Sequence, residues 1–167
     1  MFRILLSVIL FIAKLQAAAG DNLVEKDLGF IYSLKENGNG SVKYNIPEYS
    51  LQSFTTDDGK VYKKPVMIDA GQVSDEGQPD LPSSSTFIAI NPQKTYSINV
   101  NIISSNVTEN IEILPKNSWD NNSEITFEKG SSYTLQGHYP DKIAMISEPM
   151  TMRELSLVNL TVTPFRY

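Results

Sequence analysis

The sequence contains no cysteine and a single histidine, His138. Without cysteine the chain forms no disulfide, offers no thiolate nucleophile and has no thiolate ligand for zinc. A serine triad would have to combine His138 with a carboxylate such as Asp141, yet no Gly-x-Ser-x-Gly turn presents a serine. Because Tyr139 and Pro140 follow it, His138 is more simply interpreted as a turn residue at the end of a strand. The sequence therefore predicts a protein that is not an enzyme.

Helical patterning is missing as well, since no window has the 3.6-residue period of an amphipathic helix. Alternation of apolar and polar residues recurs instead, with apolar faces at Tyr96, Ile98, Val100 and Ile102, at Val158, Leu160 and Val162, and at Tyr62, Val66 and Ile68. Weaker strand candidates are residues 30–34, 42–46, 49–54, 107–114, 125–127, 133–138 and 143–146. Clusters rich in Asn, Asp and Gly separate these runs at residues 36–40, 56–59, 75–77 and 129–131. Many short strands with frequent turns predict an all-β fold, an antiparallel β-sandwich.

The most constrained stretch is DEGQPDLPSSSTFIAINP, residues 75–92. Gly77 admits a positive φ, and Pro79 and Pro82 fix φ and force extended geometry on the residue before each of them, which excludes a helix. Residues 86–90 then form an apolar run that is typical of a buried strand. We expect this strand to be the central one of the fold.

The N-terminus has the features of a secretory signal peptide at residues 1–19. Arg3 precedes an apolar run at residues 4–13, and Ala17 and Ala19 form a small-residue cleavage site. An uncleaved membrane anchor is the alternative, which the short apolar run disfavours. Cleavage would leave one secreted domain, residues 20–167, in the periplasm or at the cell surface or outside the cell.

The charge of the chain is acidic, with a net value of −5. Removing residues 1–19 takes away Arg3 and Lys14 and no acid, so the net charge would fall from −5 to −7. Such a surface repels phosphate groups, which disfavours nucleic acid as a partner and, after signal cleavage, the membrane as well.

No cofactor is predicted, because the sequence has no glycine-rich phosphate loop and no transition-metal spacing. Four carboxylates close in sequence make a weak calcium candidate: Asp69, Asp75, Glu76 and Asp80. They do not match an EF-hand loop, so solvated turn carboxylates are the favoured interpretation and Asp75 and Asp80 are kept only as weak candidates.

The most informative polar segment is KNSWDNNSE, residues 116–124, which contains the only tryptophan, Trp119. The segment lies between two strand candidates and is expected to be an exposed loop. An aromatic residue on such a loop is a common anchor for a partner protein. Trp119 folding back to cap the core is an equally weighted alternative, because tryptophan is usually substantially buried.

Two sets of residues resemble a known family. The first is Gly77-Gln-Pro-Asp-Leu-Pro82 followed by FIAINP at residues 87–92, and the second, near the C-terminus, comprises Ser132-Tyr133, Tyr139-Pro140, Ser147-Glu148-Pro149, Arg153 and TPFRY at residues 163–167. In order and spacing both resemble the N-terminal propeptides of gingipain-type cysteine peptidases, peptidase family C25. The resemblance covers the chain from about Asp27 to its end.

This resemblance implies a latency-maintaining propeptide and intramolecular chaperone. Its partner would be the cognate caspase-like cysteine peptidase domain, in cis in the full precursor, whose active-site cleft it would cover until proteolysis. In such propeptides the loop at this position can present a basic residue to the cleft. Here the loop is shorter and lacks arginine, so the resemblance makes Lys116 the candidate inhibitory residue and Trp119 a further candidate contact. A further strand follows in the family, so we expect residues 155–163 to have an open edge and the chain to be a fragment of a longer precursor or a relic without its enzyme.

The competing hypothesis is a free-standing secreted β-sandwich that binds a surface glycan or a protein. A strip of exposed aromatic residues on one face would favour it, formed by Tyr44, Tyr49, Tyr62 and Trp119. A catalytic role would instead require a titratable cluster around His138.

Overall fold

The computed structural model describes residues 3–13, 29–34, 40–119 and 124–167, with side chains left undescribed at residues 3–13 and at Leu34. Its strands are β1 (Arg3–Ala13), β2 (Phe30–Leu34), β3 (Gly40–Tyr44), β4 (Tyr49–Thr55), β5 (Val61–Met67), β6 (Gly71–Gln72), β7 (Pro82–Ala89), β8 (Ile98–Glu109), β9 (Ser118–Trp119), β10 (Ile125–Thr126), β11 (Ala144–Ile146), β12 (Met150–Met152), β13 (Leu155–Val162) and β14 (Phe165–Arg166). A short 3-10 helix, η1 (Ser131–Tyr133), is the helical element among them. No helix in the described part of the chain is long and apolar enough to cross a membrane.

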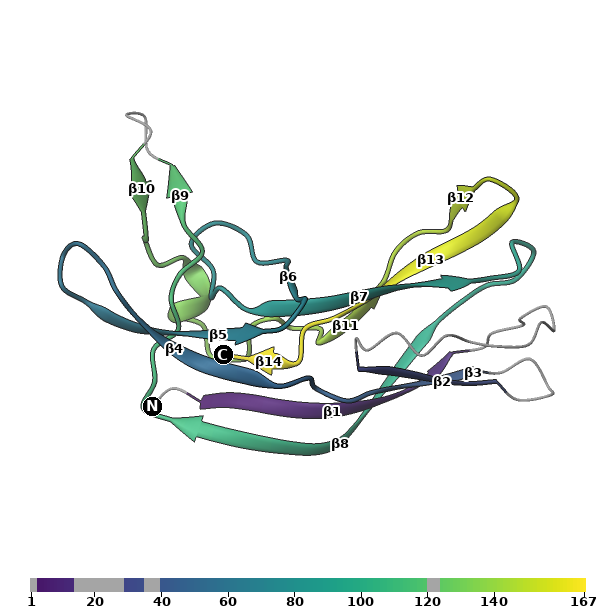
Figure 1. Cartoon of the computed structure of the whole chain (residues 1–167), viewed down its shortest axis with the longest axis horizontal. Helices are drawn as coiled ribbons and strands as arrows, with labels where there is room; N and C mark the ends of the chain where they lie inside the picture. Colours follow the sequence, from purple (N-terminus) through teal and green to yellow (C-terminus); the bar gives the residue numbers. More distant parts are fainter. Residues whose placement is uncertain (1–2, 14–28, 35–39, 120–123) are drawn as a thin grey trace.

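Two sheets form the layers of the predicted antiparallel sandwich (Figure 1). The first has the order β14-β1-β3-β2, with β8 also paired to β1, and the second has the order β11-β13-β7-β6, with β12 also paired to β13. Every strand pair in both sheets is antiparallel, which confirms the predicted fold class.

The main core lies between these layers because the strands alternate apolar and polar residues. Its buried residues are Phe30, Val42, Tyr44, Ile88, Ile90, Ile143, Ala144, Val158, Leu160 and Val162. Two hydroxyl contacts also join the layers, Tyr44 to Ser84 at 2.8 Å and Tyr32 to Thr86 at 2.6 Å. These pairs satisfy polar groups that the sandwich would otherwise bury without partners.

The strand predicted to be central is β7, which lies between β6 and β13. It begins at Pro82, four residues before the predicted run, and its apolar residues are not all buried. Ile88 is buried whereas the neighbouring Phe87 is exposed. Antiparallel sandwich sheets keep one face in water, so even an unbroken apolar run alternates between core and solvent.

Other strand predictions need correction. β8 continues through residues 104–106 to Glu109, so the separately predicted strands at residues 96–102 and 107–114 largely merge into one. Residues 133–138 form no strand, since Tyr133 is the last residue of η1 and a turn and bends follow it. In β5 the buried residues are Tyr62, Pro65 and Met67, while Ile68 is exposed, so the predicted Tyr62–Val66–Ile68 face is wrong.

The predicted leader contributes a strand to the full-length chain. Residues 3–13 form β1, which pairs along its whole length with β8 and on its other edge with β3 and β14. Ala17 and Ala19 lie outside the described residues, so signal cleavage stays a prediction. The expected open edge of residues 155–163 is wrong, because β13 has β7 on one side and β11 and β12 on the other.

Candidate functional site

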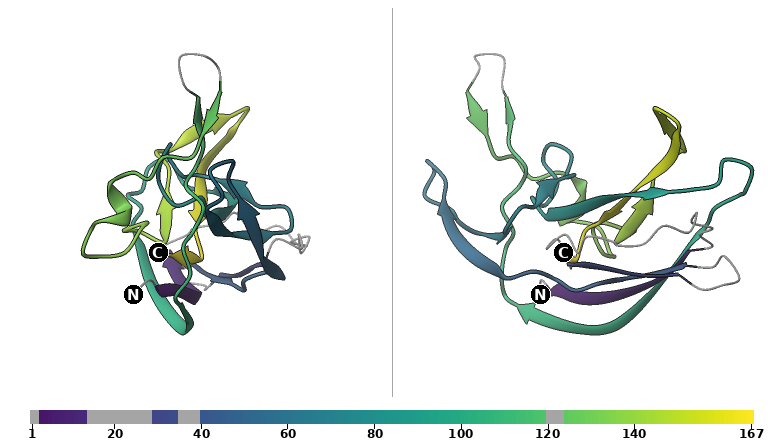
Figure 2. Two further views of the ribbon diagram at one scale, coloured as in Figure 1. Left: turned by 90° about the vertical axis from the view of Figure 1, so that its left-hand side faces the viewer. Right: turned by 45° about the vertical axis from the view of Figure 1, so that its right-hand side comes forward.

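Two hairpins extend from one end of the sandwich (Figures 1 and 2). One is formed by β4 and β5 and the other by β9 and β10, which projects away from both layers. Residues 118 and 119 of the second hairpin pair with residues 126 and 125, and the Ser118 and Thr126 hydroxyls lie 2.8 Å apart. Trp119, which the sequence predicted as a contact for a partner protein, therefore lies on this hairpin.

The Gly77–Pro82 motif fixes the base of the β9–β10 hairpin. The amide of Asp80 donates to the Leu114 carbonyl at 2.8 Å, and the amide of Lys116 donates to the Gln78 carbonyl at 2.7 Å. The Gly77 amide donates to the Lys116 carbonyl at 2.8 Å, and the Gly77 carbonyl accepts from the Gly130 amide at 2.6 Å. Gly77 is therefore hydrogen-bonded to both the entry and the exit of the hairpin. A hairpin with so few paired residues gains its fixed direction from this ladder.

A polar network supports the same base. Asp80 is 4% exposed, and its carboxylate lies 2.7 Å from the Lys64 ammonium. The Gln72 amide donates to the same carboxylate at 3.3 Å and accepts from the Lys116 ammonium at 2.6 Å. The partners of Asp80 were not predicted from the sequence. The one local signal was that Asp80, a charged residue, directly precedes Leu81, which is buried.

Lys116, the predicted inhibitory residue, lies at the base of the hairpin and not at its tip. Its backbone belongs to the ladder with residues 77 and 78, and its ammonium is held by Gln72. As it lies in this structure, its side chain points at its own domain.

Trp119 lies on the hairpin with 62% of its surface exposed. Its cross-strand neighbour Ile125 is 52% exposed, so the two form an apolar pair in solvent. The alternative in which Trp119 folds back to cap the core is therefore wrong. An exposed pair of large apolar side chains on a projecting hairpin is suited to burial against another protein.

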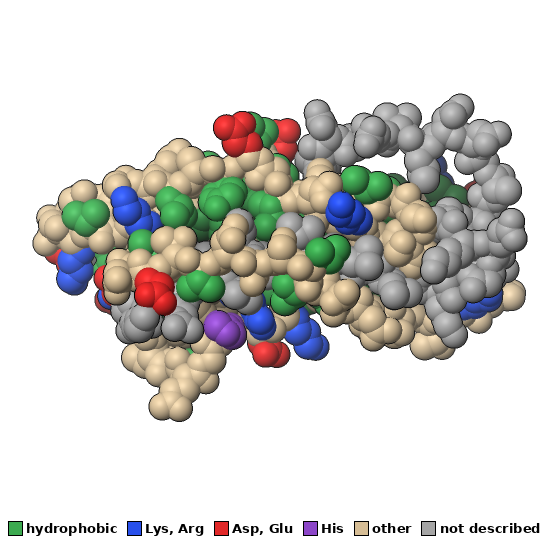
Figure 3. Space-filling view, turned by 90° about the horizontal axis from the view of Figure 1, so that it is seen from below, with side chains coloured by type: hydrophobic (Ala, Val, Ile, Leu, Met, Phe, Trp, Pro, Cys, Tyr) green, Lys and Arg blue, Asp and Glu red, His purple; other side chains and the backbone are tan. Residues whose placement is uncertain are grey.

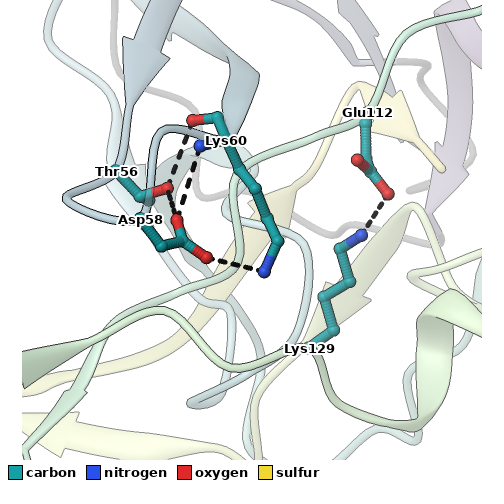
Figure 4. A network of polar contacts seen from close by, with 5 residues as sticks. All are labelled: Thr56, Asp58, Lys60, Glu112 and Lys129. Carbon is teal, nitrogen blue, oxygen red and sulfur yellow. Dashed lines mark hydrogen bonds and ion pairs between the residues drawn. The ribbon is translucent and has the colours of Figure 1, made fainter.

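A cluster of aromatic residues holds Lys129, just after the hairpin. Its ammonium forms an ion pair with Glu112 and lies 5.4 Å from the centre of the Tyr62 ring and 5.6 Å from that of Tyr133. The Tyr133 hydroxyl donates to the Ile113 carbonyl at 2.8 Å, and burial raises the pKa of Tyr133 well above its ordinary value. Lys129 is thus a structural cation (Figure 4).

The turn of the β4–β5 hairpin is shown with the Lys129–Glu112 ion pair in Figure 4. The Asp58 carboxylate accepts hydrogen bonds from the Thr56 hydroxyl at 2.5 Å and forms an ion pair with Lys60 at 2.6 Å. The hydrogen bonds from Lys60 and Thr56 lower the pKa of Asp58 to about 2. The hydrogen bond to Asp58 in turn raises the pKa of Lys60.

A cleft separates the two hairpins. The rings of Phe54 and Phe127 meet with their centres 5.2 Å apart, joining one hairpin to the other. Next to them lies an open space of about 470 Å³, the hairpin cleft, lined by Thr56, Asp57, Asp58, Lys60, Tyr62, Ile125, Phe127, Glu128 and Lys129. This cleft could not be predicted from the sequence, because its two walls lie more than sixty residues apart in the chain.

The remaining residues that the sequence suggested for catalysis, metal binding or glycan binding do not form a site. His138, purple in Figure 3, is exposed in the irregular segment before Tyr139, and among the described residues it has no hydrogen-bond or ionic partner. Asp75 is exposed, Asp80 is bound to Lys64, and the described part of the chain contains no group of three or more His, Asp or Glu that would hold a metal. Tyr44 and Tyr62 are buried, so the aromatic strip expected for a glycan binder is absent among the described residues.

Comparison with known proteins identifies the class to which this sandwich belongs. The family model Propeptide_C25 matches residues 25–167, so the chain belongs to the family of propeptides of C25 cysteine peptidases. Gingipain R2 from Porphyromonas gingivalis, in each of two strains, is 24% identical over 138 residues, which are 79% of this chain. The chain spans only 18% of the length of that relative.

Solved structures of two gingipains share the fold. A complex of the RgpB pro- and mature domains from Porphyromonas gingivalis superposes with a TM-score of 0.69 at 21% identity, covering 85% of this chain and 76% of that one. A structure that addresses the zymogenic latency of gingipain K superposes with a TM-score of 0.59 at 18% identity, covering 75% of this chain and 73% of that one.

Proposed function

We propose that this domain keeps the cysteine peptidase domain of a secreted precursor latent and assists its folding, and that proteolysis ends its action at the cell surface or in the periplasm. The observation that carries the proposal is the projecting β9–β10 hairpin with Trp119 exposed on a braced base. A relative of similar fold has been solved as a complex of its pro- and mature domains, which supports a peptidase domain as the partner.

The physical basis for latency is tethering. Two domains in one chain meet at an effective concentration of about a millimolar, so a modest interface suffices before cleavage and releases after it. A rigid hairpin suits this role because it loses little conformational entropy on binding. The hairpin would enter the active-site cleft, and Trp119 would be its main apolar contact.

Lys116 is proposed as the basic residue of this contact. To enter a substrate-binding pocket its ammonium would have to leave Gln72, which lies 2.6 Å away. Exchanging one exposed hydrogen bond for another costs little, so the geometry permits this movement. Its position at the hairpin base favours a supporting contact over one deep in the cleft.

The test uses the purified chain and a gingipain-type peptidase domain, with hydrolysis of a peptide substrate as the measurement. We expect inhibition that weakens about 30-fold or more in Trp119→Ala, as for an aromatic anchor at the centre of an interface. Leu155→Ala is the matched control, because Leu155 is 58% exposed at the start of β13, away from the hairpins, and it should inhibit like the unmodified chain. Lys116→Gln distinguishes the role of the basic residue, with a loss of less than tenfold for a supporting contact. Inhibition that is absent, or equal in the Trp119 and Leu155 variants, contradicts the proposal.

A further inference from the structure

We propose that the hairpin cleft is a binding site for a basic side chain, an arginine, on the surface of the peptidase domain. This inference rests on the proposed function and adds a second contact, in which the partner inserts a residue into the propeptide. The cleft would fix the angle at which the β9–β10 hairpin meets the peptidase.

The charges around the cleft favour a cation. Its two lysines are already paired, Lys60 with Asp58 and Lys129 with Glu112. Asp57 and Glu128 also line the cleft, and neither forms an ion pair or a side-chain hydrogen bond with any described residue. Two carboxylates without counter-ions, in a cleft whose other charges cancel, leave a net negative potential that attracts a positive group.

The apolar lining favours arginine over lysine. Ile125 and Phe127 line the cleft together with the two carboxylates, and the Phe54 ring packs against the Phe127 ring. A guanidinium stacks on aromatic faces while its edge bonds carboxylates, whereas an ammonium is more strongly hydrated and lacks a flat face. The space of about 470 Å³ is ample for one such side chain.

The position of the cleft points to the partner that Trp119 contacts. Ile125 lines the cleft and is also the cross-strand neighbour of Trp119. A protein surface that covers Trp119 therefore extends over the mouth of the cleft, and the two sites form one continuous interface. The net charge of −5 on the chain further favours a basic patch on that surface.

The first experiment needs no peptidase. The ¹⁵N-labelled full chain is titrated with N-acetyl-arginine amide and with N-acetyl-citrulline amide, a neutral analogue of the same shape. A ligand of this size is expected to bind with a dissociation constant of about 1 mM. The arginine probe should shift the amide signals of Asp57, Gly59, Glu128 and Lys129, the citrulline probe should not, and the Asp57→Asn/Glu128→Gln double variant should lose the response. Equal shifts with both probes, or none with either, overturn the inference.

The second experiment separates this inference from the proposed function. The double variant is compared with the unmodified chain in the peptidase inhibition assay, and we expect inhibition to weaken about tenfold because two charge contacts are lost. Asp75→Asn/Glu76→Gln, which removes two charges from an exposed turn that does not line the cleft, is the control and should leave inhibition unchanged. If Trp119→Ala weakens inhibition and the cleft variant does not, the function stands and the arginine site is refuted. If the chain does not inhibit at all, the function fails while the titration still decides the site.

Discussion

Gly77 provides the sharpest test of how the candidate hairpin is held. Its φ is +74°, in the region where an L side chain is strained. A Cβ added there would lie 3.1 Å from the Glu128 carbonyl oxygen and 3.3 Å from the Gly130 nitrogen, both backbone atoms at the hairpin exit. Gly77→Ala therefore combines backbone strain with displacement of the hairpin base.

The magnitude follows from three terms. A left-handed backbone costs alanine about 1–2 kcal/mol, and the lower entropy of the unfolded chain returns about 0.4–1 kcal/mol. Moving residues 128–130 away would weaken the hydrogen bond from Gly130 to Gly77, at about 1 kcal/mol. We expect Gly77→Ala to lower the free energy of unfolding by about 2 kcal/mol.

Two other glycines separate these terms. Gly59 has a φ of +80° but open space around it, so Gly59→Ala should show the strain alone, a loss of about 1 kcal/mol or less. Gly137 has open space and no positive φ, so Gly137→Ala should change stability by about 0.5 kcal/mol at most. Urea unfolding gives the free energies, and hydrogen exchange of residues 114–130 shows whether the loss lies in the hairpin. If Gly77→Ala costs no more than Gly59→Ala, the close contact with residues 128–130 contributes nothing and the reasoning is refuted.

Three further predictions concern the surroundings of the hairpins. Lys64→Met removes the ionic partner of Asp80 and leaves a buried carboxylate, so the free energy of unfolding measured in urea should fall by about 2–3 kcal/mol, a value reduced because Lys64 is about one-third exposed. In the folded chain the pKa of Asp58 is lowered from 3.8 to about 2. The contribution of Asp58 to stability is therefore complete above pH 4 and is lost as the pH falls through 2. The difference in stability between the unmodified chain and Asp58→Asn should shrink over that interval. Phe54→Ala and Phe127→Ala should show a coupling of about 0.5–1.5 kcal/mol in a double-mutant cycle, because the two rings meet between the hairpins.

Each of these predictions has a control. Lys63→Met removes the neighbouring ammonium of β5, whose side-chain contact is an exposed hydrogen bond to Ser53, and should cost less than about 1 kcal/mol. For Asp58 the control is the same comparison at several pH values above 4, where the difference in stability between the two chains should stay constant. Additive effects of the two phenylalanine variants would show that the hairpins are held independently, contrary to the structure.

The strands that were predicted well are those whose environment is uniform along their length. In β13 the apolar residues Val158, Leu160 and Val162 all face the one core, so the period of two survives intact. β2 agrees with its predicted bounds for a similar reason, since it pairs with one neighbour throughout. A local pattern is sufficient where a single face of a strand is buried in a single core.

Strands whose side chains are not buried in one common core were predicted poorly. In β5, Tyr62 belongs to the cluster around Lys129, while Met67 belongs to a second core cluster, so no one face stays buried. The other buried residues of this second cluster are Leu81, Ile113, Phe165 and Tyr167. β8 has no buried residue, and even Val100 and Ile102 of its predicted apolar face are exposed, so that prediction is wrong. Its continuation through residues 104–106 depends on pairing with β1. Such pairing is long-range and leaves no mark in a window of ten residues.

The candidate site was the least predictable part of the structure, although it includes the most constrained stretch of the sequence, residues 75–92. Gly77 and the two prolines after it signalled fixed backbone geometry, and the positive φ of Gly77 agrees with that expectation. The sequence did not show what this geometry is for, because the partners of residues 77–80 are residues 114–116 and 130. The motif that carries the family resemblance is thus the one that orients the projecting hairpin. The proposed function requires one hairpin to be presented in a fixed direction, and the rigidity of this turn, which would provide that direction, is what the Gly77 variant measures.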